Sequence, residues 1–211
     1  MKVGILFDLD GTLLDTLADL TDATNYVLRA HGYPERTISE IRRFVGNGAA
    51  NQIRLSVPDG EDFEPVLATY KPYYDAHCQI KTAPYAGVLE ALAELKDYPM
   101  AVVSNKPHSA VQVLCKLYFG DIYARGEAPD CPRKPAPDMI LRTMEALGVE
   151  TCVYVGDSEV DVLTAQNAGV PCLSVLWGFR DADVLRQAGA THFCESPETL
   201  PQTLRKLIES M

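Results

Sequence analysis

Short apolar segments alternate with stretches of helical spacing from about residue 84 to the end of the chain, and this alternation limits the folds that the chain can adopt. Strands that alternate with helices form a parallel sheet that helices cover on both faces. The sequence therefore predicts an α/β fold with a Rossmann-like parallel sheet core. The apolar runs typical of buried strands are 3–7, 100–104, 122–124, 152–155, 171–176 and 191–194. The helical patterns between and after these runs are 87–96, 109–119, 138–147, 160–168, a stretch from 182, and 198–209.

Residues 16–82 interrupt this alternation, because they contain helical patterns with no convincing strand between them. We expect them to form an α-helical cap domain inserted into an α/β core of residues 1–15 and 83–211. The two connections, near 14–17 and 82–85, would then be hinges. The alternative is one layered domain that contains every helix, but a run of four helices does not fit against one edge of a sheet. The helical patterns of the expected cap are 17–31, 38–44, 49–57 and 63–77.

Composition and charge argue against several classes of partner. The chain has 211 residues, of which 47% are apolar, and this is enough for a buried core. Its formal net charge of −10 argues against nucleic acid as a partner, since phosphate backbones bind clustered Lys and Arg. No apolar run approaches the roughly 18 residues of a membrane span. The first residues lead into a strand pattern rather than a signal peptide.

The six cysteines are scattered along the chain, and none form a Cys-x-x-Cys pair. This usage is typical of reduced thiols in a cytoplasm. The cysteines and the four histidines also show no spacing that would bind zinc. We therefore expect a cytoplasmic protein that binds neither nucleic acid nor membrane.

Two carboxylates follow the first expected strand directly. Asp8 and Asp10 flank Leu9, and Gly11 and Thr12 come next. Gly11 should end the strand, so that both acids leave the backbone in a loop. Paired acids at the end of a buried strand are costly unless a cation or a reaction needs them, so the segment indicates a site for phosphoryl transfer. The simpler alternative is a polar turn.

Three later segments place polar groups at comparable positions. Ser104 and Asn105 end an apolar run, Lys134 precedes a proline and a helical pattern, and Asp157 and Asp161 follow another apolar run. The carboxyl ends of parallel strands meet at one edge of a sheet, where open α/β folds bind their ligands. Each residue also has an ordinary alternative. Ser104 and Thr12 would then be local hydrogen-bonding residues, Lys134 a solvated lysine, and the two acids caps of the following helix.

Taken in order, an acid pair, a strand-end hydroxyl, a lysine and a second acid pair resemble the four motifs of the haloacid dehalogenase superfamily of phosphatases. The resemblance covers nearly the whole chain and implies Mg²⁺-dependent hydrolysis of a small phosphate monoester. It implies that Asp8 is the nucleophile, which forms an aspartyl-phosphate, and that Asp10 is the general acid and then the general base. Since a halide leaving group needs no proton, Asp10 favours phosphate transfer over carbon–halogen cleavage.

The same resemblance implies how Mg²⁺ and the phosphoryl group are held. The metal ligands would be the carboxylates of Asp8 and Asp157 and the backbone carbonyl of Asp10, and Asp161 would contact metal-bound water. Lys134 would supply the positive charge that balances the site. The expected donors to phosphoryl oxygens are Thr12, Ser104 and the backbone of Asn105.

A loop in the expected cap resembles the substrate-specificity loop of phosphoglycolate phosphatases. Residues 42–48 read Arg-Arg-Phe-Val-Gly-Asn-Gly, and Ser104-Asn105-Lys106-Pro107 resembles the Thr-Asn-Lys-Pro of that branch. Because the loop precedes a helical stretch, its backbone N–H groups are suited to an anion, and Arg43 or Arg54 would add positive charge. The alternative is an ordinary turn between cap helices. The cap residues expected to select 2-phosphoglycolate are Arg43, Gly46, Asn47 and Gly48.

Other functions use related chemistry. Within the same fold, the alternatives are a pyrophosphatase, another sugar-phosphate phosphatase or a phosphoglucomutase. From a different class, the alternative is a phospho-acceptor signalling module, since receiver domains also use acids, a hydroxyl and a lysine with Mg²⁺. Asp10 and the cap argue against it, because a receiver does not enclose a leaving group. The expected partner is a small phosphorylated metabolite, and the expected assembly is a monomer or a homodimer.

Overall fold

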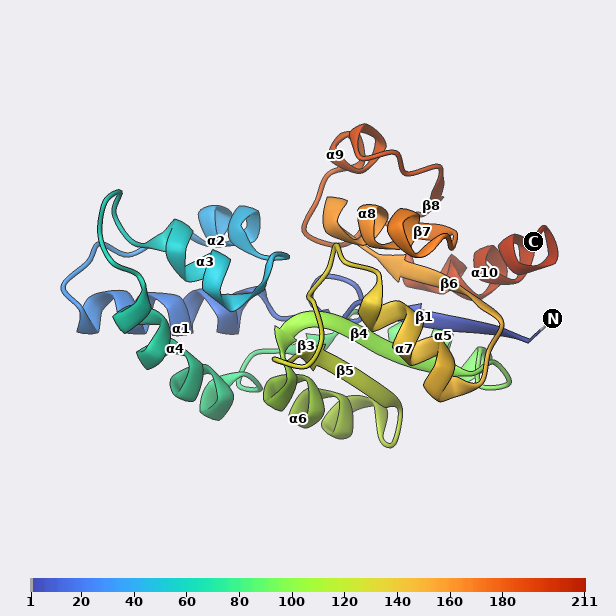
Figure 1. Cartoon of the computed structure of the whole chain (residues 1–211), viewed down its shortest axis with the longest axis horizontal. Helices are drawn as coiled ribbons and strands as arrows, with labels where there is room; N and C mark the ends of the chain where they lie inside the picture. The colour runs from blue at the N-terminus through green and yellow to red at the C-terminus, as the bar shows by residue number, and fades with distance from the viewer. Residues whose placement is uncertain (1) are drawn as a thin grey trace.

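The computed structural model describes residues 2–211, and its centre is a six-stranded sheet (Figure 1). The strands lie in the order β5-β4-β1-β6-β7-β8, and all neighbouring strands are parallel. This is the strand order of a doubly wound, Rossmann-like sheet, so the expected α/β fold is confirmed. The strands are β1 (Val3–Phe7), β4 (Met100–Pro107), β5 (Tyr123–Glu127), β6 (Thr151–Gly156), β7 (Cys172–Val175) and β8 (His192–Cys194).

The strand order places β1 at the centre of the sheet. The chain first adds β4 and β5 on one side of β1, and then returns to add β6, β7 and β8 on the other side. Crevices for ligands form where the strand order reverses in this way, at the carboxyl ends of the strands. Here that point lies between β1 and β6, which are followed directly by Asp8 and Asp157.

Two strands are longer than the sequence predicts. β4 continues to Pro107 and β5 to Glu127, three residues beyond the expected ends of each. The pairing of β4 with β5 shifts register after Val103 and resumes where Pro107 lies opposite Glu127. Such irregularities redirect the side chains that follow them. As a result, Ser104, Asn105 and Lys106 lie within β4, on its approach to the edge of the sheet.

Helices cover both faces of the sheet, as the alternation predicts. Successive side chains of a strand point to opposite faces. Ile5 and Phe7 of β1 accordingly belong to a buried cluster with α5, α6 and α10, whereas Leu6 belongs to a second cluster with α7 and α8. The core helices are α5 (Val88–Glu94), α6 (His108–Phe119), α7 (Asp138–Leu147), α8 (Glu159–Ala168), α9 (Ala182–Gln187) and α10 (Leu200–Glu209), the last preceded by a 3₁₀ turn (Pro197–Thr199).

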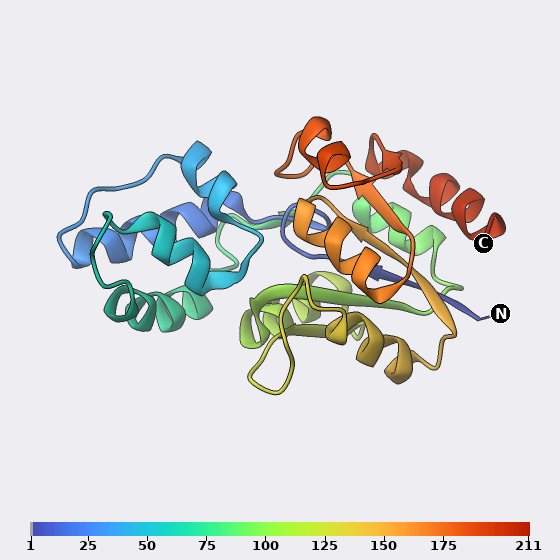
Figure 2. The ribbon, with the colours of Figure 1, turned by 45° about the horizontal axis from the view of Figure 1, so that its top comes forward.

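Four further helices lie beside the carboxyl edge of the sheet, and they are called the cap below (Figure 2). Leu14 and Asp15 (β2) pair with Pro84 and Ala83 (β3) in a short antiparallel ribbon, so the two connections run side by side. The Asp19 carboxylate accepts hydrogen bonds from the backbone N–H groups of residues 81 and 82 at 2.9–3.0 Å, which ties the cap to this ribbon. The division of the chain at residues 16–82 remains a proposal. The cap helices are α1 (Leu17–Ala30), α2 (Ile38–Phe44), α3 (Gly48–Ser56) and α4 (Glu64–His77).

Two properties bear on the expected environment of the chain. Within residues 2–211, none of the helices has the length and apolar character needed to cross a membrane. The six cysteines are free thiols, and all except the partly exposed Cys172 are buried.

Candidate active site

Asp8 lies at the carboxyl end of β1, in the crevice between β1 and β6. Its backbone N–H donates to the Val155 carbonyl at 2.8 Å, which continues the β1–β6 pairing up to the acid itself. The side chain is buried, and its Oδ1 lies 2.9 Å from the Lys134 ammonium. Oxygen atoms of Asp8, Asp157 and Asp161 all lie within 4.8 Å of one another. The fold therefore brings together acids that are about 150 residues apart in the sequence.

Lys134 is the counter-charge of this acid cluster. Its side chain is 1% exposed, and its ammonium contacts Asp8 at 2.9 Å, Asp161 Oδ1 at 2.7 Å and the Tyr154 hydroxyl at 2.9 Å. Burial alone would lower the pKa of Lys134, but the Asp161 and Asp8 carboxylates raise it above the usual value. The ammonium is therefore charged at neutral pH, and it is held by groups of the core alone.

Asn105 positions Lys134 rather than facing a ligand with its side chain. Asn105 Oδ1 accepts from the Lys134 backbone N–H at 2.8 Å, and its Nδ2 donates to the Lys134 carbonyl at 2.9 Å. The same Nδ2 lies 3.0 Å from the Gly46 carbonyl in the cap. The sequence predicts a backbone role for Asn105 at the phosphoryl group; the structure adds a side-chain role that the sequence analysis did not foresee.

The pKa of Asp8 is raised to about 6, mainly by burial, with Lys134 opposing the shift and the nearby carboxylates of Asp161 and Asp10 adding to it. Burial also raises the pKa of Asp157 well above its usual value, with Asp161 and Asp8 contributing. Three buried carboxylates thus share one ammonium, which is an unfavourable excess of negative charge. Hard oxygen donors that repel one another in this way fit a divalent cation such as Mg²⁺.

Asp161 already uses both of its oxygens within the protein. Oδ1 contacts Lys134, and Oδ2 accepts from the backbone N–H of Ser158 at 3.0 Å and from its hydroxyl at 2.6 Å. Together with Ser158 it forms a capping box at the start of α8, so the helix-capping alternative raised by the sequence is realised. The expected contact of Asp161 with metal-bound water stays a prediction.

Asp157 is held by two donors from other segments. The Thr12 hydroxyl lies 3.1 Å from Oδ1, and the backbone N–H of Phe179 lies 2.7 Å from Oδ2. The sequence predicts that Thr12 donates to phosphoryl oxygens, but here its hydroxyl donates to Asp157. A Cβ added at Gly178 would lie 2.3 Å from the Asp157 Cβ and 2.5 Å from the Gly11 carbonyl oxygen, so only glycine fits there. The loop after β7 is thus part of the site, although the sequence analysis gave it no role.

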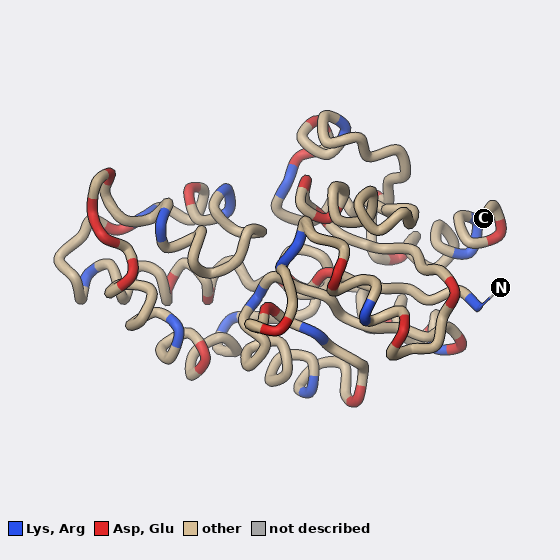
Figure 3. The backbone as a smooth tube through the Cα atoms, in the orientation of Figure 1, with Lys and Arg blue, Asp and Glu red and all other residues tan. Residues whose placement is uncertain are grey.

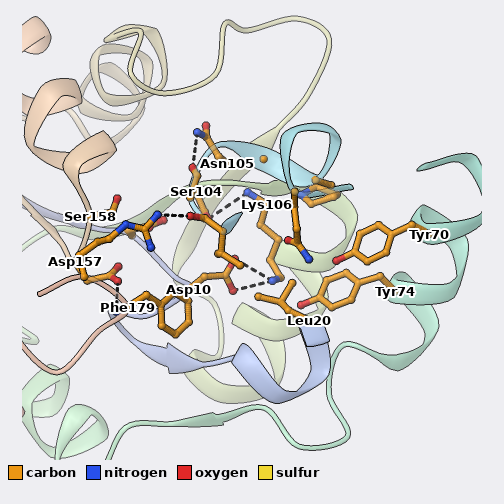
Figure 4. A pocket seen from close by; sticks show the side chains of 18 residues that line it. Asp10, Leu20, Tyr70, Tyr74, Ser104, Asn105, Lys106, Asp157, Ser158 and Phe179 are labelled. Atoms are coloured by element: carbon orange, nitrogen blue, oxygen red, sulfur yellow. Dashed lines mark hydrogen bonds and ion pairs between the residues drawn. The ribbon is translucent and has the colours of Figure 1, made fainter. Parts of the chain in front are cut away.

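Asp10 forms an ion pair with Lys106 on the side of the site that faces the cap (Figure 4). The Lys106 ammonium lies 2.7 and 3.0 Å from the two Asp10 oxygens, and 4.6 Å from the ring centre of Tyr74 in α4. The sequence singles out Lys106 only as part of a motif, and it indicates no residue of α4 for the site. The available signal was a lysine two positions after Ser104, the expected phosphate-binding hydroxyl.

A cavity of about 30 Å³ separates these groups from the cap. Core and cap line it together, so the cap as placed here encloses the ends of the strands (Figures 1 and 4). Ser104, the expected phosphate donor, is among the lining residues. The core contributes Asp8, Asp10, Ser104, Asn105, Lys106, Pro107, Asp157, Ser158, Phe179 and Arg180, and the cap contributes Leu20, Val45, Gly46, Gly48, Ala49, Gln52, Tyr70 and Tyr74.

Of the four cap residues that the sequence singles out, two line the cavity. Gly46 and Gly48 line the cavity, with φ values of +119° and +82° that favour glycine. Within residues 2–211, neither Arg43 nor Asn47 is among the lining residues, and the Arg43 side chain is exposed. The expectation that Arg43 brings positive charge to the site is therefore not met in this arrangement, because Arg43 is exposed and does not line the cavity.

Arg180 fastens the cap loop to the core. Its guanidinium donates to the carbonyl of Arg42 at 2.7 Å and to that of Val45 at 2.7 Å, and its Nε lies 2.8 Å from Glu159 Oε2. In return, the Arg42 guanidinium donates to the Gly178 carbonyl at 3.2 Å. Figure 3 shows lysine and arginine positions in the core segments that face the cap, although acids exceed bases in the whole chain. The segment 178–180 therefore contacts both Asp157 and the cap.

Comparison with known proteins agrees with this geometry. A model of the haloacid dehalogenase-like hydrolase family matches residues 5–175. The phosphoglycolate phosphatase of Rhodobacter capsulatus is 34% identical over 91% of this chain and 93% of its own, and phosphoglycolate phosphatase 1 of Pseudomonas aeruginosa is 34% identical over 97% and 78%. A crystal structure from Lactobacillus delbrueckii subsp. bulgaricus, of a protein provisionally assigned as a phosphoglycolate phosphatase, superposes with a TM-score of 0.90 at 38% identity, covering 97% of this chain and 99% of that one.

Proposed function

We propose that this chain, which belongs to the haloacid dehalogenase-like hydrolase family, is a Mg²⁺-dependent phosphatase that hydrolyses a small phosphate monoester, 2-phosphoglycolate in particular. The observation that carries the proposal is one cavity that joins the Asp8 carboxylate, the Asp10 carboxylate and the cap. The names of the most similar relatives support the choice of substrate. A cytoplasmic location and a monomer or homodimer are part of the same proposal.

Asp8 is suited to be the nucleophile. A carboxylate oxygen of Asp8 attacks phosphorus, the bond from phosphorus to the ester oxygen breaks, and the phosphoryl group remains on Asp8 as an acyl phosphate. Lys134, 2.9 Å from Asp8, keeps positive charge beside the oxygens on which negative charge develops. Ser104 lines the same cavity and is placed to donate its hydroxyl to a phosphoryl oxygen.

Asp10 completes the cycle by moving protons. As an acid it protonates the departing alkoxide, and as a base it removes a proton from the water that attacks the acyl phosphate, releasing inorganic phosphate and restoring Asp8. Mg²⁺, when bound by Asp8 and Asp157, supplies positive charge that lets two anions meet. Asp157 is kept in position for this by Thr12 and by the backbone N–H of Phe179.

The enclosure of the cavity favours a small ester. Core and cap line the cavity together, and Tyr70 and Tyr74 of the cap form part of its wall. A bulky leaving group would require the cap to stay open, which would expose the reaction to water. A signalling module has no need for such an enclosure, and this favours the enzyme.

The test is phosphate release from a panel of small esters and pyrophosphate, with Mg²⁺ and with a chelator. We expect 2-phosphoglycolate to be turned over most efficiently, and Asp8→Asn to abolish release from every compound. Asp10→Asn should slow turnover by roughly 10²- to 10⁴-fold. Asp121→Asn, at an exposed acid far from the cavity, is the matched control. Phosphate release from pyrophosphate alone would overturn the proposal that 2-phosphoglycolate is the substrate. Stable phosphate on Asp8 without turnover would support the signalling alternative.

A further inference from the structure

We propose that Lys106 of the core and Tyr74 of the cap bind a second anionic group of the substrate, a carboxylate, and that this binding releases Asp10 for proton transfer. The inference rests on the proposed phosphatase function and identifies the residues that select the substrate. It places the carboxylate at the side of the cavity opposite Lys134, where the cap closes over Asp10.

Lys106 carries a buried charge whose partner is replaceable. Its side chain is 1% exposed and lines the cavity, and within residues 2–211 its ammonium forms an ion pair with Asp10 alone. Lys134, in contrast, contacts Asp8, Asp161 and the Tyr154 hydroxyl at once. An ammonium has three N–H donors, so Lys106 retains the capacity to bind another anion.

Tyr74 presents a hydroxyl with no partner of its own. Its side chain is 1% exposed, and its Oη is buried without a hydrogen-bond partner among the residues that the structure describes. Figure 4 shows this hydroxyl directed toward the Lys106 ammonium. Burial, together with Asp10, raises the pKa of Tyr74 well above its usual value, so the group remains a neutral O–H donor. Buried hydroxyls are seldom left unpaired, and an anion bound between Tyr74 and Lys106 would pair it.

The other cations near the cavity are already engaged. Arg180 directs its guanidinium nitrogens to the carbonyls of Arg42 and Val45 and to Glu159. Arg43 is exposed and is not among the residues that line the cavity. Of the cations that line the cavity within residues 2–211, Lys106 is therefore the one that a substrate can reach by displacing one carboxylate.

The chemistry of the ligand follows from this placement. The phosphoryl group belongs beside Asp8 and Lys134, and Asp10 lies between that position and Lys106. An ester that reaches both ends carries its second anion close to the ester oxygen. A carboxylate one carbon away, as in 2-phosphoglycolate, meets this requirement, and it accepts hydrogen bonds from both an ammonium and a phenol.

The ion pair also links recognition to catalysis. With both oxygens on the Lys106 ammonium at 2.7 and 3.0 Å, Asp10 is held away from an ester oxygen. A substrate carboxylate that takes the place of Asp10 on Lys106 frees this acid to turn toward the leaving group. An ester without a second charge cannot make the exchange, so selectivity should be seen in kcat as well as in KM.

The experiment compares 2-phosphoglycolate with 2-hydroxyethyl phosphate, in which CH₂OH replaces the carboxylate. The readout is the ratio of kcat/KM for the two esters, which a general loss of activity does not change. Lys106→Met should lower this ratio by roughly ten- to a hundredfold, as expected for a lost charge-assisted hydrogen bond. Tyr74→Phe, which removes only the hydroxyl, should lower it by roughly three- to tenfold.

Two matched variants serve as controls. Lys116→Met removes an exposed lysine of α6, and Tyr73→Phe changes the neighbouring tyrosine of α4, which stacks on Tyr26 outside the cavity. Both should keep the wild-type ratio. If Lys106→Met slows the two esters equally and Tyr74→Phe leaves the ratio unchanged, Lys106 merely positions Asp10, and the carboxylate site is overturned.

Binding to the Asp8→Asn protein separates this inference from the proposed function. Calorimetry should show that adding Lys106→Met weakens the binding of 2-phosphoglycolate more than the binding of 2-hydroxyethyl phosphate. This difference should be present whether or not the wild-type protein has activity. Equal weakening would overturn the carboxylate site even if both esters are hydrolysed. If neither ester is hydrolysed but the binding difference is present, the site stands and the phosphatase proposal fails.

Discussion

The two buried lysines of the site lie in different surroundings, and the difference separates the reaction from the choice of substrate. Lys134 is held on every side by the core, through Asp8, Asp161, Tyr154 and the amide of Asn105. Within residues 2–211, Lys106 has one ionic partner, Asp10, and its ammonium also lies near the Tyr74 ring of the cap. The groups that hold the Lys134 ammonium therefore belong to the core, whereas the surroundings of Lys106 are complete only where core and cap meet.

The largest expected effect is at the core end. Lys134→Met should lower kcat/KM for 2-phosphoglycolate and 2-hydroxyethyl phosphate equally, by about 10³-fold or more, because both share the phosphoryl group. It should also reduce the free energy of unfolding by about 3–5 kcal/mol, because Asp8 and Asp161 lose their counter-charge. Steady-state kinetics and urea denaturation measure the two effects. A change in the ratio of kcat/KM for the two esters would show that Lys134, like Lys106, contributes to the choice of substrate.

Gly178 tests the segment 178–180, which contacts both Asp157 and the cap. A Cβ there would lie 2.5 Å from the Gly11 carbonyl oxygen, so Gly178→Ala must shift the backbone and the Asp157 side chain. We expect a loss of about 1–3 kcal/mol in stability and a weaker response of activity to Mg²⁺. Thermal unfolding and a Mg²⁺ titration of phosphate release measure this. An unchanged Mg²⁺ titration would show that the loop does not position Asp157.

Arg180 tests how far substrate binding depends on the contact between the cap and the core. Arg180→Met removes the donors to the carbonyls of Arg42 and Val45, and this should raise KM by roughly tenfold for both esters alike. Amide hydrogen exchange should become faster in residues 45–48 and stay unchanged in β1. The exposed Arg186→Met is the control. A selective loss for 2-phosphoglycolate alone would mean that Arg180, not Lys106, reads the carboxylate.

The smallest effect concerns pH and Mg²⁺. The folded state raises the pKa of Asp8 from 3.8 to about 6, so between these values it binds a proton that the unfolded chain has already released. Without metal, stability should therefore fall as pH rises from about 4 to about 6 and change little from this group above that. Mg²⁺ competes with that proton, so it should raise Tm by several degrees at pH 7.5 and by much less at pH 5.

The Asp8→Asn protein is the control for this pH dependence. It has lost the titrating carboxylate, so it should show a smaller Mg²⁺ shift and weaker dependence of Tm on pH between 4 and 6. Scanning calorimetry at several pH values, with EDTA or Mg²⁺, supplies the measurement. A Mg²⁺ shift that is as large at pH 5 as at pH 7.5 would contradict the assignment of the raised pKa to the metal-binding acids.

The sequence by itself determined the α/β class, the positions of the strands and most helices, and the placement of Asp8, Ser104 and Asp157 at the ends of strands. These features depend on local periodicity and on the rule that parallel strands share a carboxyl edge, so no knowledge of distant contacts is needed. Even there, β4 and β5 extend beyond their expected ends, because the pairing of Pro107 with Glu127 is a tertiary contact.

Only the tertiary structure decided which side chains meet inside the site. Lys106 and Asp10 are 96 positions apart, and their ion pair needs the direction of β4 beyond its register shift. The direction of Arg43 and the position of Tyr74 depend on how the cap is seated against the core. The physical reason is that periodicity defines the buried face of an element, whereas the partners of a buried polar group come from elements packed against it.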